Sequence, residues 1–436
     1  MKDRVTVIGA GMAGCEAAWQ IVKRDIPVKL IEMKPLRRSP AHTGDGFAEL
    51  VCSNSFKAEN LTSASGLLKA EMRLLDSLLL ECAEKTRVPA GGALAVDRER
   101  FSEEVTNALR NHPLVDVEIK AVEEIPKGPA IIATGPLTDA PPAEAIKAEE
   151  GTESLYFFDA AAPIVTAESL DKEKIFCASR YGKGDGDDYI NCPMDEQTYR
   201  AFYSALVTAQ RADVHGFEKK MVFEGCLPIE VLADRGFQTL AFGPMKPVGL
   251  IDPRTGKAPY AVVQLRRENA EGTLYNLVGF QTRLKWGEQK RVFSMIPGLE
   301  HAEFVRYGVM HRNTYLNGPK MLGKNFVWKK HPDIRFAGQM TGVEGYMESA
   351  ASGIVAGLNM ARSLLGWEEV DFGGATIVGA LERYVRTQNP DYQPMNSNFG
   401  ILDKLEERVR GKRNRYEKMA MRSLAEMKRI IEEKRV

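Results

Sequence analysis

The chain has 436 residues, of which 44% are hydrophobic and 27% charged, and its formal net charge is +0. This length is enough for two or three domains, each with a core of its own. A zero net charge indicates no global attraction to nucleic acid or membranes, although a neutral sum still allows a local basic patch. No stretch approaches the roughly 18 consecutive apolar residues of a membrane span, so we expect no membrane association.

The cysteines show no CxxC pair and no cluster with metal-ligand spacing. This pattern predicts no metal site, and it is more typical of a reducing, cytoplasmic protein than of a disulfide framework. The six cysteines are Cys15, Cys52, Cys82, Cys177, Cys192 and Cys226.

The first elements form a complete βαβ unit. A β-branched strand over residues 5–8 leads into a glycine-rich turn, a helix continues to residue 23, and a second strand over residues 28–31 ends in Glu32. In this arrangement Gly9 makes the tight turn, Gly11 lets the backbone approach a pyrophosphate, and Gly14 lets helix and strand pack closely. The helix N-terminus then presents free N–H groups to the phosphates.

Glu32 follows the glycines by about twenty residues, where a carboxylate can accept the ribose hydroxyls of an adenosine. Such an acid favours a free 2′-hydroxyl, and hence FAD or NAD over NADP. The alternative is a glycine-rich turn that binds no ligand. The cofactor-binding residues predicted here are Gly9, Ala10, Gly11, Met12, Ala13, Gly14 and Glu32.

A long irregular segment follows over residues 33–61, and its density of polar groups around Cys52 predicts an active-site loop rather than a solvated surface loop. We expect an apolar helix over residues 67–82, a second helix over 101–110, and strands within 115–125 and 130–133. The last strand enters Thr134-Gly135, where small residues could let the backbone come close to the cofactor. A plain turn is the alternative.

Residues 195–295 are predicted to form an inserted α+β domain, with a helix over 199–210 and short strands over 237–242, 260–265 and 274–280. Cys226 lies there between a glycine and a proline. Positive charge and one aromatic gather in its second half, which is most often a solvated face and alternatively an RNA contact. These residues are Arg266, Arg267, Arg283, Lys285, Trp286, Lys290 and Arg291.

A second glycine-rich loop follows a strand at residues 334–337 and precedes a helix of small residues that should begin near Glu348. It predicts that one flavin is held from both ends of a discontinuous domain, against the alternative of a tight helix packing site. The predicted cofactor-binding residues of this loop and helix are Gly338, Gln339, Gly345, Tyr346 and Ala350. Thr134 and Gly135, after the strand at 130–133, complete the predicted set.

The C-terminal residues 403–436 hold twelve Lys/Arg and seven Asp/Glu, and they indicate a basic helix from about Leu405. We therefore divide the chain into a first part of an FAD-binding domain (1–194), an insertion domain on the substrate and RNA side (195–295), and a second part with the basic helix (296–436).

Six stretches of the sequence carry a specific resemblance that spans nearly the whole chain. GAGMAGCEAAW, AELVCSNSFK, EGCLPIE, GFQTRLKWGEQKRVFSMIPGLE, YGVMHRNTY and AGQMTGVEGYMESAASG are similar to the folate- and FAD-dependent tRNA uracil-54 C5-methyltransferases. These are the shorter relatives of the flavoproteins that modify the tRNA wobble uridine. The resemblance implies an α/β fold: a glutathione-reductase-like FAD-binding Rossmann domain, discontinuous, with an inserted α+β domain.

The resemblance also implies the reaction. A methyl group would be placed on C5 of uridine 54 in the T-loop of tRNA, with the carbon from 5,10-methylenetetrahydrofolate and the electrons from NADH or NADPH through FAD. Cys52 and Cys226 match the two cysteines of the family, one of them as nucleophile and the other in activating or protecting the site. The chain ends at Val436 without the C-terminal helical region that the wobble-uridine relative uses with its GTPase partner, so we expect no obligate protein partner.

The chemistry suits a cysteine, because C5 of uracil becomes nucleophilic only after a nucleophile has added to C6, and a thiolate is a strong nucleophile that also leaves well. Three alternatives stay open: a small-molecule NAD(P)H-dependent flavin oxidoreductase, a flavin-containing RNA-binding protein without turnover, and the same methyl transfer on a ribosomal RNA uridine. A disulfide reductase would need two close cysteines beside the flavin, and no pair here has that spacing.

Overall fold

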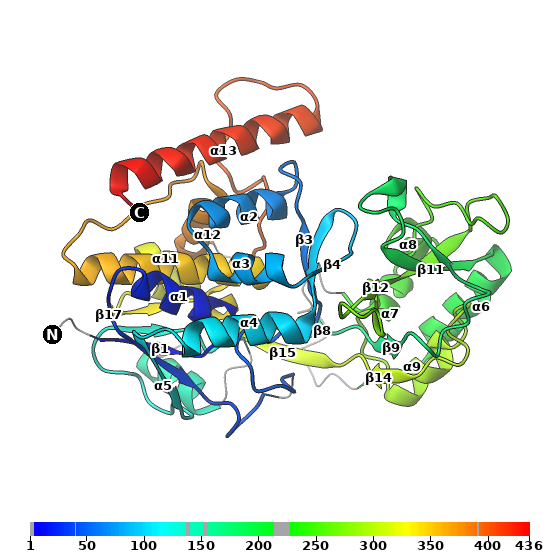
Figure 1. Cartoon of the computed structure of the whole chain (residues 1–436), viewed down its shortest axis with the longest axis horizontal. Helices are drawn as coiled ribbons and strands as arrows, with labels where there is room; N and C mark the ends of the chain where they lie inside the picture. Colours follow the sequence, from blue (N-terminus) through cyan, green and yellow to red (C-terminus); the bar gives the residue numbers. More distant parts are fainter. Residues whose placement is uncertain (1–3, 40, 137–139, 151–154, 213–226, 390–391) are drawn as a thin grey trace.

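The chain forms two units, each built on a six-stranded sheet with a hydrophobic core of its own (Figure 1). The computed structural model describes residues 4–39, 41–136, 140–150, 155–212, 227–389 and 392–436. The chain leaves the first unit through β8 (Leu155–Ala160) and returns through β15 (Met310–Tyr315). These two strands pair antiparallel, so the way out and the way back run side by side.

The sheet of the first unit has the strand order β16-β17-β7-β1-β2-β6 and is parallel except for the edge strand β16. Parallel strands place their carboxyl ends at one edge, where α/β proteins bind ligands. The predicted α/β fold with a Rossmann-type sheet is therefore confirmed. The strands are β1 (Val5–Ile8), β2 (Val28–Glu32), β6 (Val115–Ile119), β7 (Ala130–Ile132), β16 (Val327–Trp328) and β17 (His331–Phe336).

Helices cover this sheet, and a small antiparallel sheet of order β3-β5-β4 lies beside it. The helices are α1 (Met12–Val22), α2 (Ala64–Leu74), α3 (Leu78–Lys85), α4 (Arg98–Arg110), α5 (Ala140–Glu150), α10 (Gly318–Met321), α11 (Tyr346–Leu364), α12 (Ile377–Arg386) and α13 (Lys412–Lys434). The small sheet consists of β3 (Ser55–Ala58), β4 (Arg87–Val88) and β5 (Ala93–Val96).

Helices α1 and α11 pack backbone against backbone. A Cβ added to Gly353 would lie 2.1 Å from the carbonyl oxygen of Ala13, and one added to Gly357 would lie 2.4 Å from that of Ala17. No side chain fits in either place. The tight-packing interpretation of the second glycine-rich region therefore applies to its helix, whereas Gly338, at the end of β17, lies in the loop at the sheet edge.

The second unit is an antiparallel sheet of order β10-β11-β12-β13-β9-β14 with helices packed on it. Three of its strands precede the predicted insertion 195–295, two lie within it and one follows it, and the predicted boundaries stay a prediction. The strands are β9 (Ile164–Thr166), β10 (Phe176–Cys177), β11 (Tyr189–Met194), β12 (Ala261–Arg267), β13 (Leu274–Leu277) and β14 (Phe304–Arg306); the helices are α6 (Glu196–Thr208), α7 (Ile229–Asp234), α8 (Thr239–Phe242) and α9 (Trp286–Phe293).

Three predicted elements differ from the structure. The single helix over 67–82 is wrong, because α2 ends before Asp76, whose φ is +53°, and Ser77 caps a new helix by accepting from the amide of Leu80. The strand over 237–242 is wrong, because residues 239–242 form the helical turn α8. The basic helix begins at Lys412 rather than at Leu405.

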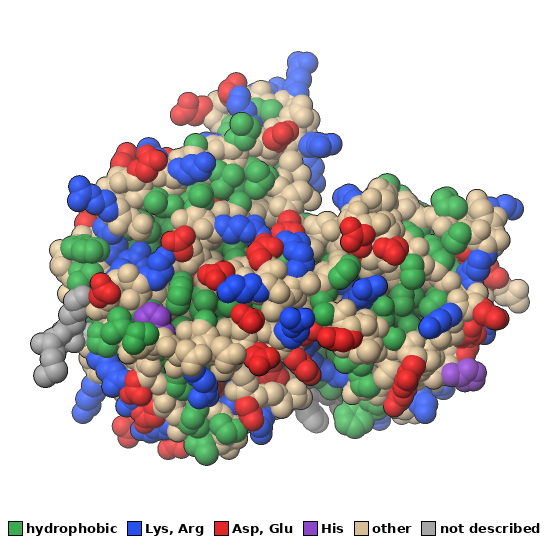
Figure 2. All heavy atoms as spheres, in the orientation of Figure 1, with side chains coloured by type: hydrophobic (Ala, Val, Ile, Leu, Met, Phe, Trp, Pro, Cys, Tyr) green, Lys and Arg blue, Asp and Glu red, His purple; other side chains and the backbone are tan. Residues whose placement is uncertain are grey.

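No helix in the described part of the chain is both long and apolar enough to cross a membrane. The face seen in Figure 2 mixes acidic and basic side chains over both units. On this face, neither unit is predominantly acidic or predominantly basic.

A buried carboxylate joins three helices and leads to the first prediction. Glu71 of α2 accepts the amides of Ile377 and Val378, both at 2.9 Å, at the start of α12, and also the hydroxyl of Ser423 in α13. Burial raises the pKa of Glu71 from its ordinary value of 4.5 to about 7, although these three hydrogen bonds oppose the shift. The folded state therefore holds a proton that the unfolded chain releases.

Because the folded pKa is raised, Glu71 contributes stability at low pH that is lost as the pH rises from about 4.5 to about 7. We expect Glu71→Gln to flatten the pH dependence of the free energy of unfolding over that window, as measured by urea denaturation. The control is Glu81→Gln, an exposed residue of α3. An unchanged slope in Glu71→Gln would show that Glu71 is ionised in the folded protein.

Candidate functional site

A cavity opens at the carboxyl edge of the first sheet, where the loops after β1, β2, β7 and β17 converge. Its lining runs from the glycine loop past Glu32 to Thr134 and Gly338, an extended course that suits a dinucleotide. The predicted site residues that line it are Gly9, Ala10, Gly11, Met12, Ala13, Glu32, Thr134, Gly135, Gly338, Gln339 and Tyr346. Gly14, Gly345 and Ala350 do not line it.

The three glycines of the first loop have different surroundings. Gly9 has φ +97°, and a Cβ there would lie 2.5 Å from the carbonyl oxygen of Ala133. A Cβ on Gly14 would lie 1.8 Å from the carbonyl oxygen of Gly9, so Gly14 is needed for packing. A Cβ on Gly11 would meet no atom within 4 Å. Gly11 therefore borders open space, which leaves room for a ligand to touch its backbone.

Glu32 connects the glycine loop to the loop after β2. Its buried carboxylate accepts the amide of Ala10 at 2.9 Å on one oxygen and the amide of Lys34 at 3.0 Å on the other. Each oxygen keeps a second lone pair that can accept a hydroxyl. The side chain is thus held in place and can still bind a ribose.

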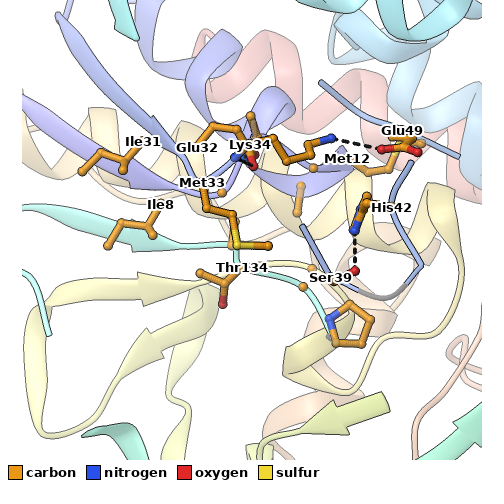
Figure 3. A pocket seen from close by; sticks show the side chains of 18 of the residues that line it. Ile8, Met12, Ile31, Glu32, Met33, Lys34, Ser39, His42, Glu49 and Thr134 are labelled. Atoms are coloured by element: carbon orange, nitrogen blue, oxygen red, sulfur yellow. Dashed lines mark hydrogen bonds and ion pairs between the residues drawn. The ribbon is translucent and has the colours of Figure 1, made fainter. Parts of the chain in front are cut away.

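The loop after β2 adds polar side chains to the cavity wall, among them Lys34, Ser39, His42 and Glu49, as Figure 3 shows. Lys34 donates to the carbonyl of Gly46 at 2.6 Å and to Glu49 at 3.2 Å, while His42 shares a hydrogen bond of 2.6 Å with Ser39. Burial lowers the pKa of His42, and the charge of Lys34 lowers it further. His42 is therefore neutral at pH 7 and can both donate and accept a hydrogen bond.

Glu49 stays ionised beside Lys34. Burial raises the pKa of Glu49, but the amides of Gly44 and Thr43 and the charge of Lys34 outweigh it, so the pKa lies below its ordinary value. Sequence reasoning placed neither Lys34 nor Glu49 in the site. Neither residue belongs to the glycine motif, and only the folded loop brings them together.

Cys52 does not itself line the cavity, but it follows Val51, which does, and it contacts Tyr346. The phenolic oxygen of Tyr346, which lines the cavity, is 3.1 Å from the Cys52 sulfur and accepts the Cys52 amide at 2.9 Å. Burial raises the pKa of Tyr346 well above its ordinary value, and the charge of Cys52 adds to the shift. Tyr346 is therefore a neutral phenol that can donate a hydrogen bond to the sulfur.

Two arginines hold the backbone just before Cys52. Arg98, from the first turn of α4, donates to the carbonyl of Leu50, and Arg306, from the end of β14, donates to the carbonyl of Val51. The first arginine belongs to the first unit and the second to the second unit. The position of the cysteine therefore depends on how the two units meet.

A third arginine holds the backbone just after Cys52. Arg266 of β12 donates to the side chains of Ser53 and Asn54, both at 2.9 Å. Its neighbour on the same strand end, Glu268, forms an ion pair with Arg98 at 2.8 Å. Arg266 therefore does not belong to the predicted solvated face, because it is buried against the Cys52 loop.

The positive charges of these three guanidinium groups also stabilise a negative charge on the Cys52 sulfur. Burial lowers the pKa of Arg266 and of Arg306, and the negative charge of a Cys52 thiolate opposes that effect in both. Burial also lowers the pKa of Arg98, but Glu268, Tyr346 and the charge of Cys52 together raise it above its ordinary value. Since electrostatic attraction is mutual, a thiolate at Cys52 lies in the field of three cations.

The other cysteines have different surroundings. Cys226 lies outside the described residues, so the structure does not relate it to Cys52. Burial raises the pKa of Cys15, Cys82 and Cys192, which is typical of inert core thiols. Cys177 is exposed.

Comparison with known proteins gives the same architecture and a family. The family model described as "Glucose inhibited division protein A" matches residues 4–368. The chain belongs to this family. It is 57% identical over 434 residues to the methylenetetrahydrofolate--tRNA-(uracil-5-)-methyltransferase TrmFO of Listeria monocytogenes serotype 4b, covering 99% of this chain and 100% of that relative. It is also 57% identical over 433 residues to the protein of the same name from Acetivibrio thermocellus, covering 99% of each.

Solved structures of Aquifex aeolicus GidA share the fold. The form II crystal aligns with a TM-score of 0.71 at 15% identity, covering 98% of this chain and 73% of that one. The form I crystal gives a TM-score of 0.70 at 16% identity and covers 98% and 76%. At this identity the likeness shows the fold alone.

The three arginines predict how Cys52 reacts. Arg306→Gln keeps a donor toward Val51 but removes one charge, so we expect alkylation of Cys52 by iodoacetamide at pH 7 to slow about fivefold, as one charge pair is worth about 1 kcal/mol in a wet site. Rates at each cysteine can be followed by peptide mass spectrometry.

The control for that experiment is Arg267→Gln, the residue next to Arg266 in β12. Burial raises the pKa of Cys177, Asp187 adds to the shift, and Arg267 opposes it. Arg267→Gln should therefore slow Cys177 and leave Cys52 unchanged. Equal rates at Cys52 in wild type and Arg306→Gln would mean that Arg306 only positions the loop.

Proposed function

We propose that the chain is a folate- and FAD-dependent methyltransferase that places a methyl group on C5 of uridine 54 in the T-loop of tRNA. The observation that carries the proposal is the Cys52 thiol, which is hydrogen-bonded to the cavity-lining Tyr346 and lies in the field of three arginines that hold its loop. The name shared by relatives 57% identical over nearly the whole chain supports the substrate and the carbon donor. The substrate partner is tRNA, and the proposed compartment is the cytoplasm.

The residues at the sheet edge fit an FAD. Gly9, Gly11 and the start of α1 would hold the pyrophosphate, Glu32 the ribose of the adenosine, and the Gly338 loop the other end of the cofactor. Bound there, FAD supplies the hydride, taken from NADH or NADPH, that converts the one-carbon unit of methylenetetrahydrofolate to a methyl group.

The protein itself would activate the uracil. A thiolate at Cys52 or Cys226 forms a bond to C6, and the electron pair of the C5–C6 double bond becomes available at C5. C5 then forms a bond to the one-carbon unit and loses its proton. The bond between that carbon and the folate nitrogen breaks with its electron pair going to nitrogen, the hydride completes the methyl group, and the sulfur–C6 bond breaks to restore the ring and the thiolate. At Cys52 the arginines would stabilise the thiolate, and the phenol of Tyr346 would hold its sulfur.

Gly11 offers a clean test of the cofactor assignment. Since a Cβ at Gly11 meets no atom within 4 Å, we expect Gly11→Val to fold normally and yet purify without flavin absorbance near 450 nm, a wavelength typical of oxidised flavins. Thermal melting of wild type stripped of flavin supplies the comparison for folding. The contrast variant is Gly14→Ala, which should lower the melting temperature because its Cβ would meet the Gly9 carbonyl oxygen. Full flavin content in Gly11→Val would refute the pyrophosphate site.

The two cysteines give the test of the reaction. Substituting the attacking cysteine by Ala should abolish transfer of labelled carbon from methylenetetrahydrofolate to tRNA, while the reduction of FAD by NADH or NADPH stays nearly intact because it needs no thiol. Transcripts with 5-fluorouridine at position 54 should trap a denaturation-resistant adduct, since the fluorine cannot leave as a proton does. Cys177→Ala is the control. If Cys52→Ala and Cys226→Ala both methylate tRNA at near wild-type rate, the nucleophile lies elsewhere.

A further inference from the structure

Three aromatic rings of the second unit form a ladder that ends at the surface. Phe304 and Tyr307 stack with centroids 5.4 Å apart and planes 11° apart, and Tyr307 stacks on Trp286 at 5.7 Å and 13°. Phe304 in turn contacts the buried Phe293 of the core. Trp286, the outer ring, is 64% exposed. Packing against the core therefore explains the position of Phe304 but does not explain the exposed ring of Trp286.

The ladder is held rigid by one buried glutamine. Gln289 of α9 donates to the carbonyls of Leu284 at 2.7 Å and Gly308 at 2.8 Å, and its oxygen accepts the amide of Gly308 at 2.8 Å. These bonds tie the chain before Trp286 to the chain after Tyr307. The outer ring is thus presented on a fixed support, which lowers the entropic cost of binding on it.

Two exposed lysines flank the outer ring. Neither Lys285 nor Lys290 forms an ion pair with any residue that the structure describes, whereas Arg291 on the same helix is paired with Glu288 at 2.6 Å. Charges of both signs are mixed over the face seen in Figure 2. On that face a polyanion would therefore rely on local contacts rather than on a broad positive surface.

The ladder shares a chain segment with a residue that holds the cysteine loop. Arg306 lies in the chain between Phe304 and Tyr307, and its guanidinium donates to the carbonyl of Val51, next to Cys52. A molecule stacked on Trp286 would therefore be linked through Tyr307 to the segment whose Arg306 holds the cysteine loop.

We propose that Trp286, backed by Tyr307 and Phe304, is a stacking platform for an unpaired nucleobase of the RNA substrate, with Lys285 and Lys290 neutralising neighbouring phosphates. This inference rests on the proposed function, in which a base must leave its stack before a cysteine can reach C6. An aromatic face replaces the stacking that the RNA loses and accepts any base. The lysines supply the part of the affinity that depends on salt.

The test compares Trp286→Ala with Trp286→Phe, using unmodified tRNA and full-length flavin-loaded protein over a series of KCl concentrations. Trp286→Ala should weaken tRNA binding about 10- to 100-fold without changing the salt slope, because stacking releases no counterions. Trp286→Phe should restore most of the affinity. Lys285→Gln and Lys290→Gln should each flatten the salt slope by roughly one.

Trp367 provides the matched control, since it is also a half-exposed tryptophan, 51% exposed, and its ring lies against Arg362 of the first unit. Trp367→Ala should bind tRNA as wild type does. Equal affinity of Trp286→Ala and wild type would overturn this inference alone. Failure of wild type to bind or methylate tRNA would overturn the proposed function as well.

Two further outcomes would assign the ring to another occupant and overturn the proposal. If Trp286→Ala binds tRNA normally but needs far more methylenetetrahydrofolate, the ring stacks on the folate. If it binds tRNA normally but changes the mass of the free protein in sedimentation, the ring is a contact between two copies of the chain.

Discussion

The direct contact between the backbones of α1 and α11 sets the dimensions of the site. Gly353 and Gly357 allow it, because any side chain at these positions would strike the carbonyls of Ala13 and Ala17. The N-terminus of α1 carries the glycine loop, and the N-terminus of α11 carries Tyr346. The separation between the two ends of the cavity is therefore fixed by helices that pack without intervening side chains, which is a more rigid arrangement than packing through side chains would give.

The cysteine loop depends on a different kind of support. Its backbone and polar side chains accept hydrogen bonds from the buried Arg266 and the half-buried Arg98 and Arg306, and Glu268 offsets part of the positive charge. Buried ion pairs of this type add little net stability, but removing one partner leaves a charge without compensation. Their value here is that they define one position for the loop and keep a strong positive field at the sulfur.

The glycine loops could be predicted from the sequence because their signals are local. A strand, a turn and a helix follow one another within thirty residues, and the φ of Gly9 and the crowding at Gly14 are properties of that one unit. The contacts that hold Cys52 could not be predicted, since Arg98 and Glu268 are 170 positions apart and Arg306 and Val51 are 255 apart. The strand expected over 237–242 failed because six residues are too few to separate strand from helix by periodicity.

The antiparallel pairing of β8 and β15 places Ala160 opposite Met310, so the chain enters and leaves the second unit at one point. A segment whose ends adjoin can be gained or lost by a gene without breaking the sheet that it interrupts. In this protein, deletion of the second unit would leave the first sheet intact but would not leave the site intact. A protein without the second unit would lose Arg266 and Arg306 and the partner of Arg98, and would keep a dinucleotide cavity with an unsupported cysteine loop. Descendants of such a deletion would inherit a nucleotide-binding scaffold and would have to evolve a new chemistry.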